Sequence, residues 1–401
     1  MTEPGAQPAG QRGAVPVLIL GKGITALGVL RSFGRRAVPA YVVGASGDLL
    51  IRSRWYKRPP GDLATEFTES DLAARLESLD VARMVLIPTS DKWAMAVSRL
   101  PPRLSQRFPA HIVAPDILER LIDKARFAQT VAEMGLPHPR TALLPDADTL
   151  RSLPAEHFRD SFLKPTQSGP FAQAFGAKAI RFKDRDDALR VYDEATGKGF
   201  GLILQEFIPG PPDQHYFIEG FIDEKGRVCG LFARRRLRMF PRDFGNSTST
   251  VSIPAEEVAS AADALARLLR GIGYHGVFSA EFKLDDRDGL LKVLEINARP
   301  WWFVGFAAQC GIDVCDMAYR DALGEELQPV LRYRIGRRCV YPRLDLESGL
   351  AEWRAARLGL FALLRSWIGA DQLVLCRDDP SPGAGEIFAW VKSRLRRKLG
   401  W

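Results

Sequence analysis

The sequence has few cysteines and histidines, and they are not arranged as metal ligands. Its 401 residues include five histidines and five cysteines, and the cysteines stand apart from one another, at Cys229, Cys310, Cys315, Cys339 and Cys376. The absence of a C-x-x-C pair or a mixed cysteine and histidine cluster argues against a zinc site. An odd number of scattered thiols is typical of a reduced, cytoplasmic protein.

Long hydrophobic runs are absent as well. The nearest candidate, LGLFALLRSWIGA at 358–370, is shorter than the roughly 20 apolar residues of a membrane span and contains Arg365. Residues 1–14 are polar and rich in proline and glycine, without the apolar core of a signal peptide. We interpret them as a disordered leader.

The charge balance is basic, with a formal net charge of +8 and a pI of about 9.3. This favours anionic partners such as nucleotides, acidic small molecules or anionic lipid. The basic residues do not alternate with aromatics as in an RNA-binding motif, so no nucleic-acid partner is expected. The tail EIFAWVKSRLRRKLGW at 386–401 is basic and amphipathic, and a solvated helix is favoured there over peripheral membrane contact.

Strands and helices alternate near the N-terminus, in VPVLILGKGITALGVLRSFGRR, AVPAYVVGAS and VARMVLIPTSDKWAMAVSRL. This order predicts a parallel, doubly wound sheet. Gly21-x-Gly23 forms half of a dinucleotide fingerprint, but the third glycine and the acidic residue after the second strand are missing. A tight strand-to-helix turn without a cofactor is therefore expected.

Two glutamates interrupt a predicted hairpin of buried strands. Strands at 277–284 and 291–297 flank the turn sequence DDRDG, and a symmetric hairpin places Glu281 directly opposite Glu295. Residues opposed in this way point to one side of the sheet, about 5 Å apart. Strict alternation also places Glu295 and Asn297 on the face of Leu291 and Val293.

Facing carboxylates repel each other unless a cation lies between them or the face is open to water. With Asn297, the pair offers the all-oxygen ligands that Mg²⁺ prefers. A solvated hairpin face is the alternative, and the residues of this hairpin leave both interpretations open.

The segment Glu295-x-Asn297-x-Arg299, with Glu281 upstream, resembles the metal-binding end of the ATP-grasp superfamily. Three further motifs follow the order of that family between residues 113 and 320. These are Asp123-Lys124, the FLKP segment with Lys164 before the glycine loop 166–178, and the apolar strand LILQEFIPG. The segments IPTSDKWA, QEFIPG and EINARPWW are most similar to its carboxylate–amine ligase branch. The loop departs from the family pattern, because it holds only Gly169 and Gly176. Its binding of phosphate therefore stays open.

The resemblance implies an α/β protein, with α+β character in the catalytic part. It implies an ATP-grasp fold preceded by a Rossmann-like, doubly wound domain and followed by a small extension. The expected divisions are 1–14, the leader; 15–112, the Rossmann-like domain; 113–328, the ATP-grasp domain, with subdomains 113–205 and 206–328; and 329–401, the extension.

The resemblance also assigns ligands. ATP and Mg²⁺ are the expected cofactors, with Mn²⁺ as the alternative metal, and the implied metal ligands are Glu281, Glu295 and Asn297. The residues implied to bind ATP are Lys124, Lys164 and Lys178 for the phosphates, Gln205, Glu206, Phe207 and Ile208 for adenine, and Asp213 and His215 for the ribose. Ordinary surface charge is the alternative for each lysine, and a packed side chain the alternative for His215.

The implied catalytic groups are arginines. Arg299 is expected to point at the transferring phosphoryl group, and either Arg236 or Arg238 to steady the acyl phosphate. Alternation predicts that Arg236 and Arg238 share one face of their strand. A solvated edge strand is the alternative.

The implied activity is that of an ADP-forming carbon–nitrogen ligase. Such an enzyme activates a small carboxylate as an acyl phosphate and couples it to an amine. Two alternatives stay open: a carboxylase-type outcome on the same fold, and a non-catalytic ATP-binding protein associated with membrane. A homodimer also stays open, because dimers are frequent among similar proteins.

Overall fold

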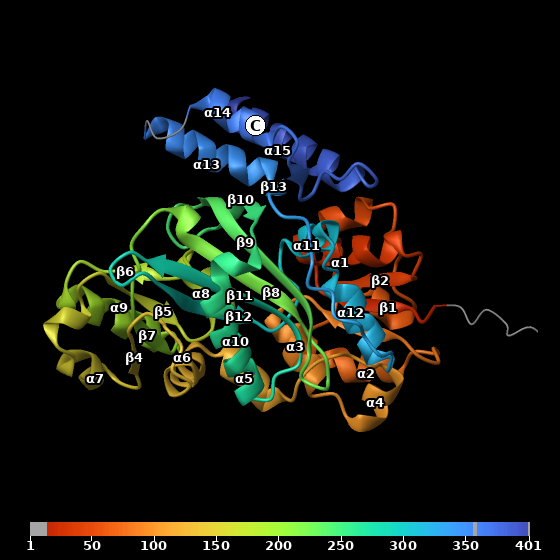
Figure 1. The fold of residues 1–401 in the computed structure, drawn as a ribbon, viewed down its shortest axis with the longest axis horizontal. Helices are drawn as coiled ribbons and strands as arrows, with labels where there is room; N and C mark the ends of the chain where they lie inside the picture. The colour runs from red at the N-terminus through yellow and green to blue at the C-terminus, as the bar shows by residue number, and fades with distance from the viewer. Residues whose placement is uncertain (1–13, 356–358, 400–401) are drawn as a thin grey trace, which may run out of the picture.

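A computed structural model describes residues 14–355 and 359–399. The predicted leader therefore lies outside the described residues except for Ala14, as do the last two residues of the tail. The described residues form three β-sheets with helices packed around them, and the C-terminal helices cover one end of the largest sheet (Figure 1). None of the helices in the described part of the chain is both long and apolar enough to cross a membrane.

The N-terminal sheet is parallel and has the strand order β2-β1-β3. Its strands are β1 (Val17–Leu20), β2 (Ala40–Val43) and β3 (Val85–Pro88). Helix α1 (Gly23–Arg35) packs on the face of β1 that carries Ile19, and the opposite face packs against α2 (Leu72–Glu77), α3 (Asp91–Ser98) and α4 (Pro102–Arg107). Helices on both faces confirm the predicted doubly wound arrangement.

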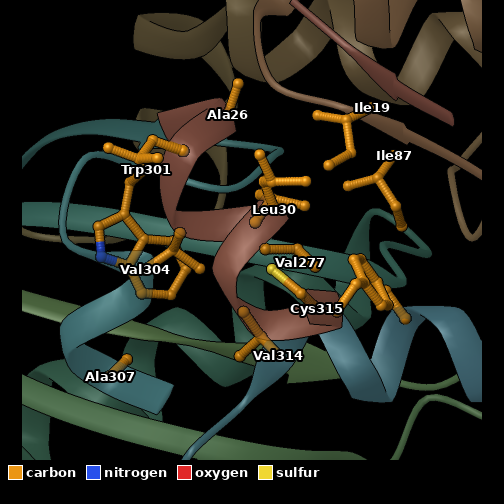
Figure 2. Close-up of a cluster of buried hydrophobic side chains, with 14 of the residues drawn as sticks. Ile19, Ala26, Leu30, Ile87, Val277, Trp301, Val304, Ala307, Val314 and Cys315 are labelled. Atoms are coloured by element: carbon orange, nitrogen blue, oxygen red, sulfur yellow. The ribbon is translucent and has the colours of Figure 1, made fainter. Parts of the chain in front are cut away.

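Helix α1 also joins this sheet to later parts of the chain. Ala26 and Leu30 lie in one buried cluster with residues of α11 (Val304–Cys310) and α12 (Val314–Ala322) (Figure 2). Gly28 leaves room for the close approach, because an added Cβ would lie 3.0 Å from Val304. The N-terminal sheet is thus fixed by apolar packing to the chain segment that follows Arg299.

The second sheet is antiparallel, with the order β4-β7-β5-β6. Its strands are β4 (Thr141–Leu144), β5 (Ser161–Pro165), β6 (Ile180–Arg181) and β7 (Leu202–Glu206). Its helices are α7 (Ala147–Ser152), α8 (Ser168–Phe175) and α9 (Arg185–Gly197).

Helix α8 lies where the sequence predicted an open glycine loop, and that prediction is wrong for residues 168–175. Phe171 and Phe175 stack with ring centroids 4.4 Å apart, and both rings pack against Phe200. Because the fully buried Phe171 and the partly buried Phe175 lie one helical turn apart and stack, they hold the segment as a helix. The left-handed Gly176, at φ 67°, ends it.

The largest sheet has seven strands in the order β12-β11-β8-β9-β10-β13-β14. Their bounds are β8 (His215–Ile222), β9 (Val228–Phe240), β10 (Asn246–Ser252), β11 (Gly276–Asp285), β12 (Leu290–Asn297), β13 (Arg338–Val340) and β14 (Asp371–Gln372). Helices α5 (Pro115–Ile122), α6 (Lys124–Glu133) and α10 (Ala259–Gly271) contribute to the core on one of its faces.

A bulge in β12 changes which residues face the core. Glu281 pairs with Glu295 as predicted, but Phe282 pairs with Val293, so Leu294 is an extra residue in its strand. Leu291 and Val293 therefore pack in the core, whereas Glu295 and Asn297 face the opposite side. The expectation that all four share a face is wrong, because the bulge shifts the alternation by one residue.

The C-terminal segment is built into the same sheet. Strand β13 pairs with β10, and the helices that follow are α13 (Pro342–Arg354), α14 (Leu360–Trp367) and α15 (Ser381–Leu399). Asp345 of α13 is fully buried and accepts two hydrogen bonds from Arg238 of β9. It also accepts from Thr248 of β10 and from the Trp367 indole, so one carboxylate joins two strands to two helices.

Replacing this carboxylate should destabilise the protein. We expect Asp345→Ala to lower the free energy of unfolding by about 3–5 kcal/mol, because the Arg238 guanidinium is left without its buried partner. Chemical denaturation of both proteins measures the difference. Asp148→Ala, which removes an exposed pair with Arg151, is the matched control and should leave the denaturation midpoint unchanged. Equal midpoints for all three proteins would contradict the structural role of Asp345.

Candidate functional site

A cavity of about 620 Å³ lies between the second and the largest sheets. It is lined by residues of β5 and β7 on one side and of β8, β9, β11 and β12 on the other, together with Lys22, Thr25 and Thr89 from the N-terminal part. Thirteen of the fifteen predicted site residues line it: Lys124, Lys164, Lys178, Gln205, Glu206, Phe207, Ile208, His215, Arg236, Glu281, Glu295, Asn297 and Arg299.

The cavity is strongly cationic. Its lining includes nine lysine and arginine side chains but only four carboxylates. Low-dielectric walls of one predominant sign concentrate their field on the enclosed space. An anionic ligand is the natural occupant.

Glu281 is held as a carboxylate by its neighbours. Its Oε1 accepts from His215 Nδ1 at 2.7 Å and from the Arg236 guanidinium at 3.0 Å. Burial raises the pKa of Glu281, but the Arg236 charge and the His215 hydrogen bond outweigh it, so the net pKa is well below the usual range. The group is ionised at neutral pH.

His215 serves Glu281 as a neutral hydrogen-bond donor. Burial, followed by the nearby Arg236 charge, lowers the pKa of His215 to about 4. Because the carboxylate can only accept, the proton of the neutral ring must lie on Nδ1, which leaves Nε2 as an acceptor.

Glu295 faces Glu281 from the next strand and begins a chain of polar contacts. Asn297 donates to Glu295 Oε1 at 3.2 Å, and Arg299 donates to Asn297 Oδ1 at 3.1 Å. The Nε of Arg299 donates to Asp91 at 2.7 Å. The N-terminal sheet therefore orients Arg299 through Asp91, which lies in the first turn of α3.

The three predicted phosphate lysines reach the cavity from three elements. Lys124 opens α6, where the Asp123 side chain caps the helix, and its ammonium lies 3.9 Å from Glu295. Lys164 of β5 lies 3.4 Å from Gln205 Oε1, and Lys178 donates to Asn246 across the cavity.

Lys164 is the most perturbed of these lysines. Burial, followed by repulsion from the Lys124 ammonium, lowers the pKa of Lys164 to about 8. A bound anion would reverse this shift, because it would stabilise the charged form.

Residues 206–208, the hinge at the end of β7, belong to the segment predicted to bind adenine, and hydrogen bonds and an ion pair fix their position. The Glu206 carboxylate is bound by Arg287 at 2.8 Å and by the Arg140 N–H, and the Phe207 N–H donates to Asp160. In residues 14–355 and 359–399 the Ile208 N–H has no hydrogen-bond partner. One main-chain donor therefore stays available to a ligand at this edge of the cavity.

Two predicted residues do not line the cavity. Asp213 lies in the short helix η5 (Pro212–Gln214), and Pro212 lines the cavity in its place. Arg238 binds Asp345, because Leu237 is an extra residue in β9 that ends the alternation after Arg236. The prediction that Arg236 and Arg238 share a face is therefore wrong, and Arg236 is the one that reaches the cavity.

The sequence analysis missed several lining residues. Lys283 follows Glu281 by two positions in the same strand, so alternation could have found it. Its pKa is lowered to about 8 by burial and then by Arg236. Arg234, two positions before Arg236 in the same strand, also lines the cavity and forms a buried pair with Glu219 at 2.7 Å. No local sequence pattern predicted that Lys22 lines the cavity or that Asp91 binds Arg299.

The acidic pair fits a divalent cation. Both carboxylates face the cavity from directly paired positions, and Asn297 adds an amide oxygen beside them. Among the described residues, no group of three or more acidic, histidine or cysteine side chains could hold a metal alone. The pair would therefore share its cation with Asn297 and with oxygens of a ligand.

Comparisons with known proteins show which proteins the chain resembles. No protein-family model matches the sequence. A D-aspartate ligase of Enterococcus faecium is 26% identical over 327 residues, which cover 77% of this chain and 76% of that enzyme.

Solved structures share the fold at low sequence identity. The biotin carboxylase domain of Hydrogenobacter thermophilus 2-oxoglutarate carboxylase, in complex with MgADP, ADP and bicarbonate, has a TM-score of 0.62 at 18% identity. The match covers 82% of this chain and 74% of that one. An L-amino acid ligase of Bacillus licheniformis has a TM-score of 0.56 at 14% identity, covering 82% and 79%. The shared architecture shows that the chain has the ATP-grasp fold.

Proposed function

We propose that this protein is an ATP-dependent ligase that joins a small carboxylate to an amine and releases ADP and phosphate. The observation that carries the proposal is the ionised Glu281 placed directly opposite Glu295 inside a cationic cavity. The similarity to a D-aspartate ligase, and the fold shared with an L-amino acid ligase, support carbon–nitrogen ligation as the reaction class.

The chemical difficulty of this reaction is that one anion must attack another. A substrate carboxylate has to approach the γ-phosphate of ATP, so the protein must neutralise charge and hold both groups in line. Mg²⁺, held by Glu281, Glu295 and Asn297, would supply part of that neutralisation. Lys124 and Lys164 would bind the α- and β-phosphate oxygens, and Lys178 the outer phosphate.

The arginines would act on the transferred group. Arg299 is fixed between Asn297 and Asp91, so its guanidinium needs little reorganisation to bind the phosphoryl oxygens. Arg236 is buried and held by Ser247 and Glu281, and would steady the acyl phosphate until the amine attacks its carbonyl carbon. The bond to the phosphate oxygen then breaks, and phosphate leaves.

The nucleotide base would lie at the hinge. The free Ile208 N–H can donate to a ring nitrogen of adenine, and the neighbouring apolar side chains can enclose its faces. His215 Nε2, the acceptor left by the Glu281 contact, is available to a ribose hydroxyl.

The first experiment tests the reaction class. ADP release should depend on both an acid and an amine when pairs of amino acids and hydroxy acids are screened, and mass spectrometry should find the amide. ADP release that needs bicarbonate and no amine would favour a carboxylase instead, an outcome that the fold of the biotin carboxylase domain makes worth testing. ATP binding without turnover in every pair would contradict both.

Loss of one acidic ligand should abolish the activity found in that screen. We expect Glu295→Ala to lower the rate of ADP release by about a hundredfold to a thousandfold, because developing phosphate charge loses its stabilisation. Glu194→Ala, which removes an exposed partner of Lys198 on α9, should keep the wild-type rate. Wild-type activity in Glu295→Ala would refute the metal assignment.

Nucleotide affinity should depend on pH through Lys164. The pKa of about 8 means that the free protein carries the ammonium below pH 8 and loses it above. The Kd for ATP should therefore rise above pH 8, by at most about tenfold per pH unit for one proton. In Lys164→Arg the charge persists, so this rise should be smaller than in wild type. Lys283 contributes its own titration, so the difference between the two proteins, measured by calorimetry from pH 7 to 9.5, is the test. Identical pH profiles would contradict it.

A further inference from the structure

The C-terminal helices expose several large apolar side chains at the surface of the described chain. On α14, Phe361 is 78% and Leu364 55% exposed, and Ile368 just after the helix is 74% exposed. On α15, Phe388 is 68% exposed, and Ile387, Val391 and Leu395 are exposed as well. Isolated exposed leucines are common, but a concentration of this kind marks an interaction surface.

The exposed residues of α15 form one stripe. At about 100° per residue, Ile387, Phe388, Val391 and Leu395 fall within an arc of about 100°. On the same projection Arg394 flanks one edge of the stripe and Lys392 and Arg396 flank the other, and all three are exposed. An apolar stripe bordered by basic residues is the arrangement of helices that lie in a lipid interface.

Helices α14 and α15 both contact helix α13. Leu363 of α14 packs against Gly349 of α13, and Arg394 of α15 pairs with Glu347 of α13 at 2.6 Å. The three helices lie at the outer end of the molecule, beyond β10 and β13 (Figure 1). Their exposed side chains are therefore accessible without rearrangement of the sheet.

Basic residues predominate around the stripe. Helix α14 contains no acidic residue, and the single acidic residue of α15, Glu386, is engaged by Tyr341 and Arg343. Arg365, Lys392 and Arg396 are exposed, and the sequence of α15 also contains Arg397 and Lys398.

We propose that α14 and α15 form a docking surface for an anionic phospholipid bilayer, on which the protein rests without crossing it. The apolar side chains would enter the boundary between headgroups and acyl chains, and the basic side chains would bind the headgroup phosphates. A second copy of the chain fits less well, because a twofold interface sets a patch against itself and would bring these basic residues together. The proposal is independent of the ligase reaction.

Vesicle flotation of the full chain tests the proposal. The protein should float with phosphatidylcholine vesicles that contain about 30% phosphatidylglycerol, bind far less to pure phosphatidylcholine, and be released by high salt. The double variant Phe388→Glu/Val391→Glu should lower the binding constant by about tenfold or more, since it removes apolar contacts and adds like charge to the lipid. Leu290→Glu, the same change at an exposed leucine of the β11–β12 hairpin, is the matched control and should bind as wild type does.

Two outcomes would overturn the proposal. One is absence of binding to anionic vesicles, or equal binding by the double variant. The other is a wild-type dimer in light scattering that the double variant abolishes while vesicle binding is unchanged, because the stripe would then contact a second copy. Circular dichroism and ATP binding of the variant verify that it is folded, so a loss of vesicle binding can be assigned to the surface.

Discussion

The charge arrangement of the cavity depends on two carboxylates that face each other on neighbouring strands. Glu281 and Glu295 repel each other, and the positive charge that surrounds them offsets this repulsion. Arg236 binds one of them and Lys124 lies near the other. The same cations that compensate the pair make the space between the sheets attractive to phosphates, and the pair makes it attractive to a divalent metal.

The features that the sequence predicted well are those encoded locally. Alternation of strand and helix predicted the parallel N-terminal sheet, because each apolar run and its following turn are contiguous in the chain. The opposition of Glu281 and Glu295 was also predicted, but the turn alone does not produce it, because the turn pairs Asp285 with Leu290 and the bulge at Leu294 then brings Glu295 opposite Glu281. The order of the lysine, hinge and acidic motifs predicted the ATP-grasp fold, although each motif alone is weak. Most of the residues that this resemblance assigned line one cavity.

The features that could not be predicted depend on single inserted residues or on distant partners. The bulges at Leu294 and Leu237 each add one residue to a strand, and neither leucine differs from the residue types expected in a regular strand. Helix α8 forms where glycine suggested a loop, because packing of its aromatic rings outweighs local propensity. The contact of Arg299 with Asp91 spans 208 positions, which no local pattern encodes.

The position of Asp345 has a consequence for dividing the chain. A fragment that ends before β13 would leave the main-chain groups of β10 unpaired along one edge, a template for intermolecular strand addition. It would also lack Asp345, the carboxylate that binds Arg238. Arg238 would then be buried without its partner, two positions from Arg236 in the same strand. The segment from β13 onward is therefore an integral part of the sheet, and shortened versions of the protein should aggregate before they reveal anything about its chemistry.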